Sequence, residues 1–191
     1  MLITLEQLED CIPKATDKDR MAFIKPINQT LEEFDINTNT RIAAFLAQVA
    51  HESGNLRYTE ELASGTNYEY RKDLGNLDFR ALQIAHANYT TTGKFYKGRG
   101  LIQITGYFNY KECGEALGLD LIHVPTLLVE EENACRSAGW FWKKHNCNTL
   151  ADQDKFAHIS QAINGGKLGQ ANGHIERDEN YLRCKRVFGL T

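Results

Sequence analysis

The order of apolar and polar residues predicts a chain that is helical along most of its length. The clearest stretch is 40–53, where Ile42, Phe45, Val49 and Glu52 fall at helical spacing, so that an acidic residue ends an apolar stripe. The same kind of spacing predicts further helices at 5–11, 17–34 (with an interruption at Pro26), 78–87, 107–117, 130–145, 153–163 and 174–188.

One short segment, 100–105, has the alternation of a strand instead of the period of a helix. In a strand, Ile102 and Ile104 would share one face and enter the core. Gln103 and Thr105 would share the other face and line a groove. The alternative is a β-hairpin whose polar face simply lies in solvent. The predicted fold class is therefore mainly α, with a small β element.

Composition indicates a globular protein. The chain has 191 residues, of which 42% are hydrophobic and 25% are charged, and these values are ordinary for a compact domain. The length suits a single domain over 1–191 without a separate binding module. The formal net charge of −3 gives no general attraction for nucleic acid.

The sequence has no run close to the roughly 18 apolar residues that a transmembrane helix needs. Its N-terminus, Met-Leu-Ile-Thr-Leu-Glu-Gln-Leu-Glu-Asp, is acidic and amphipathic and lacks the basic start and apolar block of a signal peptide. We therefore expect a protein that is made and held in the cytoplasm, and that needs a separate release factor if it acts outside.

The cysteines favour reduced thiols over a disulfide framework, because their number is odd and no Cys-x-x-Cys occurs. They are Cys11, Cys113, Cys135, Cys147 and Cys184. A zinc site is not expected either. His51-Glu52 resembles the start of a His-Glu-x-x-His motif, but Asn55 occupies the position of the second histidine.

Two carboxylates are the first candidates for chemistry. Glu52 ends the apolar stripe near the negative pole of its predicted helix, and both its burial and the helix dipole favour the protonated form. Glu61 follows nine positions later, beyond Gly54 and in a polar segment, and should stay ionised. One protonated and one ionised carboxyl group are what acid/base chemistry at neutral pH requires.

The last predicted helix carries an arginine on its apolar face, because Arg177, Tyr181 and Cys184 fall at helical spacing. A half-buried guanidinium requires a carboxylate partner, for which Glu52 and Glu61 are candidates, unless the side chain extends to water.

Three ordered motifs resemble glycoside hydrolase family 19, the chitinase family that also contains many bacteriophage endolysins. They are Ala-His-Glu-Ser at 50–53 with Glu61 beyond it, Gly-Arg-Gly-Leu-Ile-Gln-Ile-Thr-Gly at 98–106 followed by Asn109, and Ile-Asn-Gly-Gly at 163–166. The resemblance covers roughly residues 40–188. It implies a lysozyme-like, bilobal helical fold with a cleft between the lobes.

The resemblance also implies roles for individual residues. Glu52 corresponds to the general acid, Glu61 to the general base, and Thr105 to the residue that holds the attacking water. Arg177 corresponds to the arginine that pairs with the acid. The residues expected at the substrate are His51, Tyr96, Gln103, Asn109, Asn164 and Arg177. The family carries a glutamate shortly after Ile-Asn-Gly-Gly, where this chain has Lys167-Leu168-Gly169.

The implied reaction inverts the anomeric carbon of a glycan and needs no metal or cofactor. From the sequence we expect a monomeric endolysin that hydrolyses β-1,4 bonds of peptidoglycan. Such a protein would accumulate in the host cytoplasm and lyse the cell once a separate factor disrupts the membrane. The alternatives are a chitinase, a non-catalytic glycan-binding protein, and a cell-wall peptidase or amidase.

Two points stay open in the sequence. Glu60 is the base instead of Glu61 if the alignment of the loop is off by one. A basic cluster at Arg183, Lys185 and Arg186 is either a solvated helix face or an aid in approaching anionic envelopes.

Overall fold

A computed structural model describes residues 2–191 and shows a mainly helical protein. Its α-helices are α1 (Leu5–Cys11), α2 (Asp17–Glu33), α3 (Asn39–Glu52), α4 (Phe79–Ala87), α5 (Thr92–Phe95), α6 (Tyr107–Leu117), α7 (Glu131–Lys144), α8 (Cys147–Asp152), α9 (Phe156–Asn164) and α10 (His174–Val187). Short 3-10 helices are η1 (Thr66–Tyr68), η2 (Lys72–Leu74) and η3 (Pro125–Val129). None of these described helices is both long and apolar enough to cross a membrane.

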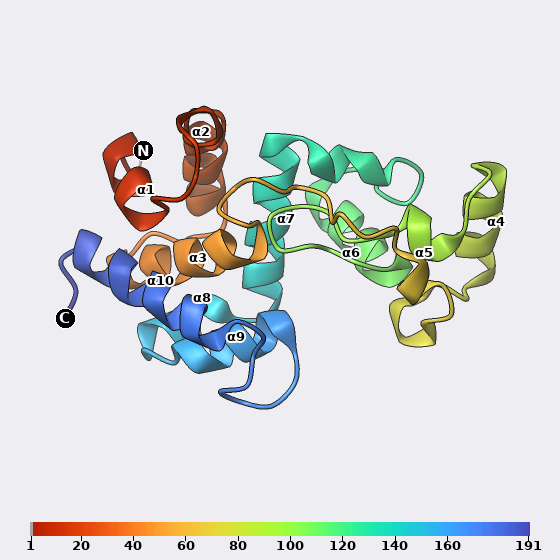
Figure 1. The fold of residues 1–191 in the computed structure, drawn as a ribbon. Coiled ribbons are helices and arrows are strands. Elements are labelled where there is room, and N and C mark those ends of the chain that lie inside the picture. The colour runs from red at the N-terminus through yellow and green to blue at the C-terminus, as the bar shows by residue number, and fades with distance from the viewer. Residues whose placement is uncertain (1) are drawn as a thin grey trace.

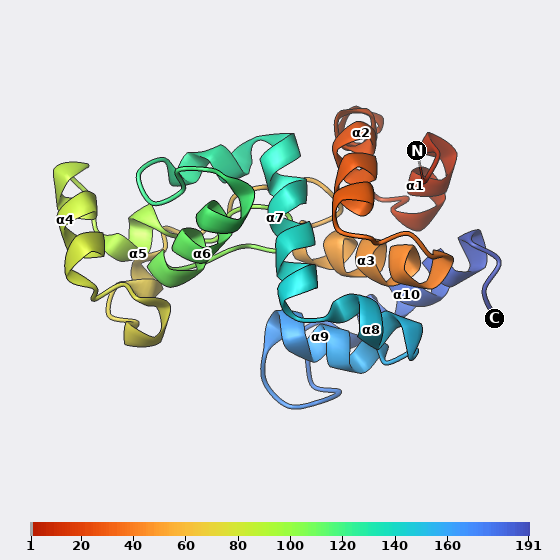
Figure 2. The ribbon, with the colours of Figure 1, turned by 180° about the vertical axis from the view of Figure 1, so that it is seen from behind.

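The helices form two lobes, as the sequence predicted. One lobe contains both termini together with α1, α2, α3, α8, α9 and α10, and the other contains α4, α5 and α6 (Figure 1). Helix α7 stands between them, which the view from behind shows clearly (Figure 2). It packs against α2 on one side and α6 on the other, while α3 packs against α10.

Helix α3 is the centre of the first lobe and ends at the candidate acid. Thr38 caps its start by accepting a hydrogen bond from the backbone N–H of Arg41. Phe45 is fully buried and meets the Trp142 ring of α7 edge-on, with ring centroids 5.3 Å apart. The apolar face thus fixes the direction of α3 and places Glu52 at its C-terminal end.

Two helix predictions are wrong in detail. Helix α2 runs through Pro26 without a break, because burial of Phe23, Ile27 and Leu31 on either side outweighs the roughly 3 kcal/mol that an internal proline costs. The helix expected at 153–163 begins later, at Phe156, and the short α8 precedes it. Asp154 separates the two with a positive φ of 53°, a conformation in which a right-handed helix cannot continue.

The expected strand at 100–105 is absent. Over the described residues the segment forms turns, with isolated bridges pairing Arg99 to Glu60 and to Ile104. The cause lies in the backbone, because Gly100 and Gln103 have positive φ values of 82° and 58°, which an extended strand does not contain. Ile102 and Ile104 are buried. The expectation that the isoleucines belong to the core is confirmed, and the β element reduces to these bridges.

Candidate active site

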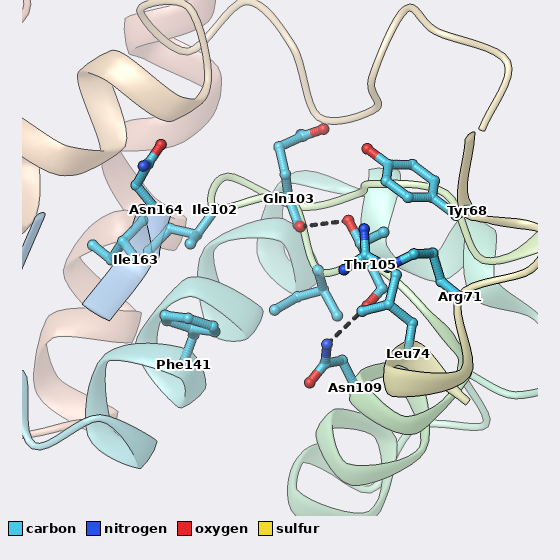
Figure 3. Close-up of a pocket in the computed structure, with 11 residues that line it drawn as sticks. Tyr68, Arg71, Leu74, Ile102, Gln103, Thr105, Asn109, Phe141, Ile163 and Asn164 are labelled. Atoms are coloured by element: carbon cyan, nitrogen blue, oxygen red, sulfur yellow. Dashed lines mark hydrogen bonds between the residues drawn. The ribbon is translucent and has the colours of Figure 1, made fainter. Parts of the chain in front are cut away.

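A pocket of about 320 Å³ lies where the two lobes meet. One wall comes from η1, η2 and the turn between them, with Tyr68, Arg71 and Leu74. The opposite wall comes from α7 and α9, with Phe141, Ile163 and Asn164. The floor between the walls consists of Ile102, Gln103, Ile104, Thr105 and Asn109. Figure 3 shows these two walls facing each other across Gln103 and Thr105. Four of the predicted site residues, Gln103, Thr105, Asn109 and Asn164, therefore share one pocket.

The floor of the pocket is held by its own hydrogen bonds. Thr105 donates its hydroxyl to the carbonyl of Gln103 at 2.9 Å, and Asn109 donates from Nδ2 to the carbonyl of Thr105 at 2.8 Å (Figure 3). Gln103 donates from Nε2 to the carbonyl of Gly100 at 2.8 Å. Because the amide nitrogen of Gln103 is used in this way, its Oε1 faces the neighbouring Gly98.

Three side-chain oxygens converge on Gly98. A Cβ at this position would lie 2.8 Å from Oε1 of Gln103, 3.1 Å from Oε2 of Glu61 and 3.3 Å from Oγ1 of Thr105. The backbone N–H of Glu61 also donates to the carbonyl of Gly98 at 3.0 Å. The absence of a side chain at Gly98 thus lets a carboxylate, a hydroxyl and an amide oxygen approach one point.

Glu60 and Glu61 have different surroundings. Glu60 forms an ion pair with Nε of Arg99 at 2.8 Å, and Nζ of Lys97 lies 3.5 Å from the same oxygen. Arg99 itself is buried. Glu61 instead accepts a hydrogen bond from the hydroxyl of Tyr68 at 3.0 Å. Since Glu60 is bound to Arg99, this arrangement favours Glu61 as the residue available for chemistry.

Arg177 of α10 is 1% exposed and reaches the end of α3. Its Nη2 contacts Oε1 of Glu52, its Nη1 donates to Oε1 of Gln48 at 2.5 Å, and its Nε donates to the carbonyl of Asn172 at 2.9 Å. The prediction that this arginine seeks a carboxylate is confirmed, and Glu52 is the partner. The alternative, an arginine extended into water, is wrong.

His51 lies beside this pair and is held from α10. Its Nδ1 is 2.7 Å from Oε2 of Glu176, and its ring packs directly on Gly173, where a Cβ would lie 2.1 Å from Cε1. The segment 167–169 that departs from the family pattern has no carboxylate. The carboxylate that pairs with His51, the residue before the predicted acid, comes from Glu176, next in sequence to Arg177.

The predicted substrate contact of Tyr96 is contradicted. This side chain is fully buried, and its hydroxyl donates to the carbonyl of Ile122 at 2.7 Å. Its ring packs against those of Phe95 and Tyr107, with centroids 4.9 and 5.4 Å away. Tyr96 is therefore a core residue and does not line the pocket.

Tyr68 both lines the pocket and donates to Glu61, and the sequence pattern did not predict it. Burial raises the pKa of its phenol, and so do the hydrogen bond to Glu61 and that carboxylate's charge. The only signal was its position in a polar segment shortly after Glu61, and no periodicity marks it. Arg71 was missed for the same reason. Phe141 lies on the predicted helix α7, but its pattern did not mark it as a pocket residue.

The described residues offer no obvious metal site. Over 2–191, no group of three or more histidine, cysteine, aspartate or glutamate side chains is placed to hold an ion. All five thiols are free and buried.

Comparison with known proteins connects this geometry to a family. Residues 21–173 match the glycoside hydrolase family 19 profile described as Chitinase class I. An endochitinase of Arabidopsis thaliana is 35% identical over 179 residues, covering 90% of this chain and 56% of the relative. An inactive chitinase-like protein of Hevea brasiliensis is 35% identical over 111 residues, covering 56% of this chain and 35% of the relative. The chain thus spans little more than half the length of the first of these relatives, and about a third of the second.

The fold also matches a solved structure. Chitinase C from Streptomyces griseus HUT6037 aligns with a TM-score of 0.75 and 23% identity, covering 100% of this chain and 78% of that chain. At this identity the match concerns the fold, which is the mainly helical, two-lobed architecture described above.

Proposed function

Because the chain belongs to glycoside hydrolase family 19, we propose that it hydrolyses the β-1,4 bonds of N-acetylglucosamine polymers of the chitin type. The observation that carries this proposal is the convergence of oxygens from Glu61, Gln103 and Thr105 on Gly98. Gln103 and Thr105 also line the pocket between the lobes. Peptidoglycan was the substrate favoured by the sequence. The relatives' names include endochitinases and favour the chitin alternative.

In the proposed reaction Glu52 gives a proton to the glycosidic oxygen while Glu61 takes a proton from the attacking water. Thr105 orients this water: its hydroxyl proton is used by the Gln103 carbonyl, so its oxygen is left to accept a hydrogen bond. The water attacks the anomeric carbon from the face opposite the leaving group. Attack from that face requires carboxyl groups about 6.5–9.5 Å apart. Each proton transfer is expected to contribute about 10²- to 10⁴-fold in rate.

Arg177 has a defined task in this scheme. Proton donation leaves Glu52 as a carboxylate, and the buried guanidinium on Oε1 stabilises that new charge. The proton itself is then carried by Oε2, the oxygen that Arg177 does not contact. The burial of Arg177 strengthens this interaction, because few waters compete for it.

The pocket walls suit an N-acetylated sugar. The amides of Asn109, Asn164 and Gln103 offer hydrogen bonds to hydroxyl and acetamido groups. Phe141 and Ile163 offer an apolar surface to the acetamido methyl and the ring faces. Such a mixture of an apolar lining with a few polar groups is typical of small-molecule and glycan sites.

The test is a comparison of substrates with the purified chain. N-acetylglucosamine hexamer and colloidal chitin should release new reducing ends, and Glu52→Gln should abolish the release. Permeabilised Gram-negative cells, followed by loss of turbidity, measure activity on peptidoglycan in parallel. Binding of the hexamer without turnover would replace the proposal with the non-catalytic glycan-binding protein, and free amines without reducing ends would indicate a peptidase or amidase.

The cellular role predicted from the sequence stays a prediction. It comprises a monomer that accumulates in a host cytoplasm and lyses the cell after a separate factor disrupts the membrane. Expression of the chain in a bacterium should leave the culture intact until a membrane-permeabilising agent is added, and then lyse it. Intact cells after that addition would contradict the lytic role and would leave the proposed activity on chitin-type glycans unaffected.

A further inference from the structure

We infer that Tyr68 is the residue that positions the carboxylate of Glu61 for its part in the reaction. The inference rests on the proposed function, in which Glu61 is the base. Tyr68 is not a proton carrier in this scheme. It acts through the carboxylate, by fixing Oε2, the oxygen that lies with those of Gln103 and Thr105 around Gly98.

The contact between the two side chains is direct. The hydroxyl of Tyr68 donates to Oε2 of Glu61 at 3.0 Å, and across residues 2–191 no other side chain donates to this carboxylate. The second oxygen, Oε1, is buried and has no hydrogen-bond partner in the protein. A hydrogen bond to a charged acceptor is stronger than one between neutral groups, so Tyr68 anchors Oε2, the oxygen that faces Gly98 together with Thr105. The remaining lone pair of Oε2 can accept the proton of a water held beside Thr105.

Tyr68 is itself held by a buried amide that reaches the pocket floor. Asn76 is fully buried, and its Nδ2 donates to the carbonyl of Tyr68 at 2.7 Å. Its Oδ1 accepts from the backbone N–H of Tyr107 at 3.0 Å. Tyr107 follows Thr105 by two positions. The side chain of Asn76 therefore connects the backbone of Tyr68 to the segment that carries Thr105.

The other charged groups near Glu61 are already engaged. Lys97 donates to the backbone carbonyl of Glu61 at 3.1 Å and lies near Glu60, which Arg99 also pairs. Arg71 is bound to Asp73 through two hydrogen bonds of 2.8 and 2.6 Å. None of these cations contacts the carboxylate of Glu61, so the hydroxyl of Tyr68 is its principal stabilising contact.

Tyr68 stays a donor across the working pH range. Burial is the largest cause that raises its pKa, followed by the hydrogen bond to Glu61 and that carboxylate's charge; the charge of Arg71 acts in the opposite direction. A phenol whose pKa lies above its ordinary value of about 10 keeps its proton at neutral pH.

Tyr68→Phe removes the hydroxyl and keeps the ring that lines the pocket. We expect kcat on N-acetylglucosamine hexamer to fall roughly 10- to 100-fold, the size of one lost hydrogen bond to a charged group. KM should change by less than about twofold, because the ring remains and Glu61 does not bind the sugar in the ground state. The acidic limb of the kcat/KM profile should move to higher pH by about one unit, since the ionised base has lost its donor.

Tyr70→Phe is the matched control. Tyr70 stands two positions away and is 84% exposed, so the same chemical change should leave kcat, KM and the pH profile as in the wild type. Melting temperatures of both variants check that each is folded. A Tyr68→Phe enzyme with the wild-type kcat and pH profile would overturn the inference.

A second measurement does not depend on turnover. In protein labelled with ¹³C at the glutamate carboxyl carbons, the Glu61 signal is assigned by its loss in Glu61→Gln and then followed through a pH titration. The midpoint should rise by about one unit in Tyr68→Phe and stay unchanged in Tyr70→Phe. Equal midpoints in all three proteins would refute the role of Tyr68. An inactive wild type whose midpoint still shifts in Tyr68→Phe would refute the proposed function alone.

Discussion

Replacing Arg177 with alanine should strongly destabilise the protein. The guanidinium is 1% exposed and engages Glu52, Gln48 and the carbonyl of Asn172. Removing the guanidinium leaves three acceptors without their donor, and each buried polar group that loses its partner costs about 1–3 kcal/mol, or about 3–5 kcal/mol together. The side chain of Glu52 is 18% exposed, so water partly compensates it, and we expect the lower end of this range, about 3 kcal/mol.

Urea denaturation followed by circular dichroism measures this change. For a chain of this size, about 3 kcal/mol corresponds to a melting temperature lower by roughly 10 °C. Arg177→Lys keeps the charge but not the forked geometry that reaches Glu52 and Gln48 together, so its loss should be smaller, about 1–2 kcal/mol. The double variant Arg177→Ala/Glu52→Gln should recover part of the stability, because the unpaired charge is gone. An Arg177→Ala protein within about 0.5 kcal/mol of the wild type would refute the reasoning.

Three further predictions concern the pocket and the last helix. Glu61→Gln should lower kcat by about 10²- to 10⁴-fold and regain activity with azide, which attacks the anomeric carbon itself. Glu60→Gln should keep the wild-type kcat but lose stability, because Arg99 loses its charged partner. The reverse pattern would make Glu60 the base. Gly98→Ala should fold, yet lower kcat by about 10²-fold, because the new Cβ would lie 2.8–3.3 Å from the three oxygens that meet there; a wild-type rate would contradict their role. In the basic cluster, exposed Arg186 should tolerate alanine in both stability and activity on soluble substrate. Arg183→Ala should lower the melting temperature, since Arg183 donates to the carbonyl of Cys11 at 3.1 Å, and equal melting temperatures for the two variants would contradict this difference.

Hydrophobic periodicity correctly predicted the features that depend on which residues share one face of a helix. The stripe that ends at Glu52 marked α3, and the apolar neighbours of Arg177 predicted a buried guanidinium that needs a carboxylate. Both conclusions hold because an α-helix places residues at fixed angles, so that the sequence alone says which side chains share a face. The choice of Glu52 over Glu61 as the partner required the packing of α10 against α3.

Contacts in irregular segments could not be predicted in this way. The hydroxyl of Tyr68 reaches Glu61 because of the turn at η1 and the hydrogen bond from Asn76 to the Tyr68 carbonyl. Neither feature has a periodic signature in the sequence. Tyr96 was expected at the substrate from the family resemblance, which gives the place of a residue in the sequence but not the direction of its side chain. In the structure its hydroxyl donates to a backbone carbonyl inside the core. The strand at 100–105 failed because the backbone turns at Gly100 and Gln103, whose φ values of 82° and 58° are not revealed by the alternation of apolar and polar residues.

The configuration of the first product tests the central claim most directly. N-acetylglucosamine hexamer is mixed with the wild-type chain, and ¹H NMR spectra are recorded before the new reducing ends mutarotate. If Glu61 activates a water opposite the bond that Glu52 protonates, the β-linked substrate must first yield the α-anomer. Appearance of the β-anomer first would contradict the account, because it would require a covalent intermediate or a substrate-assisted route in place of direct attack by water.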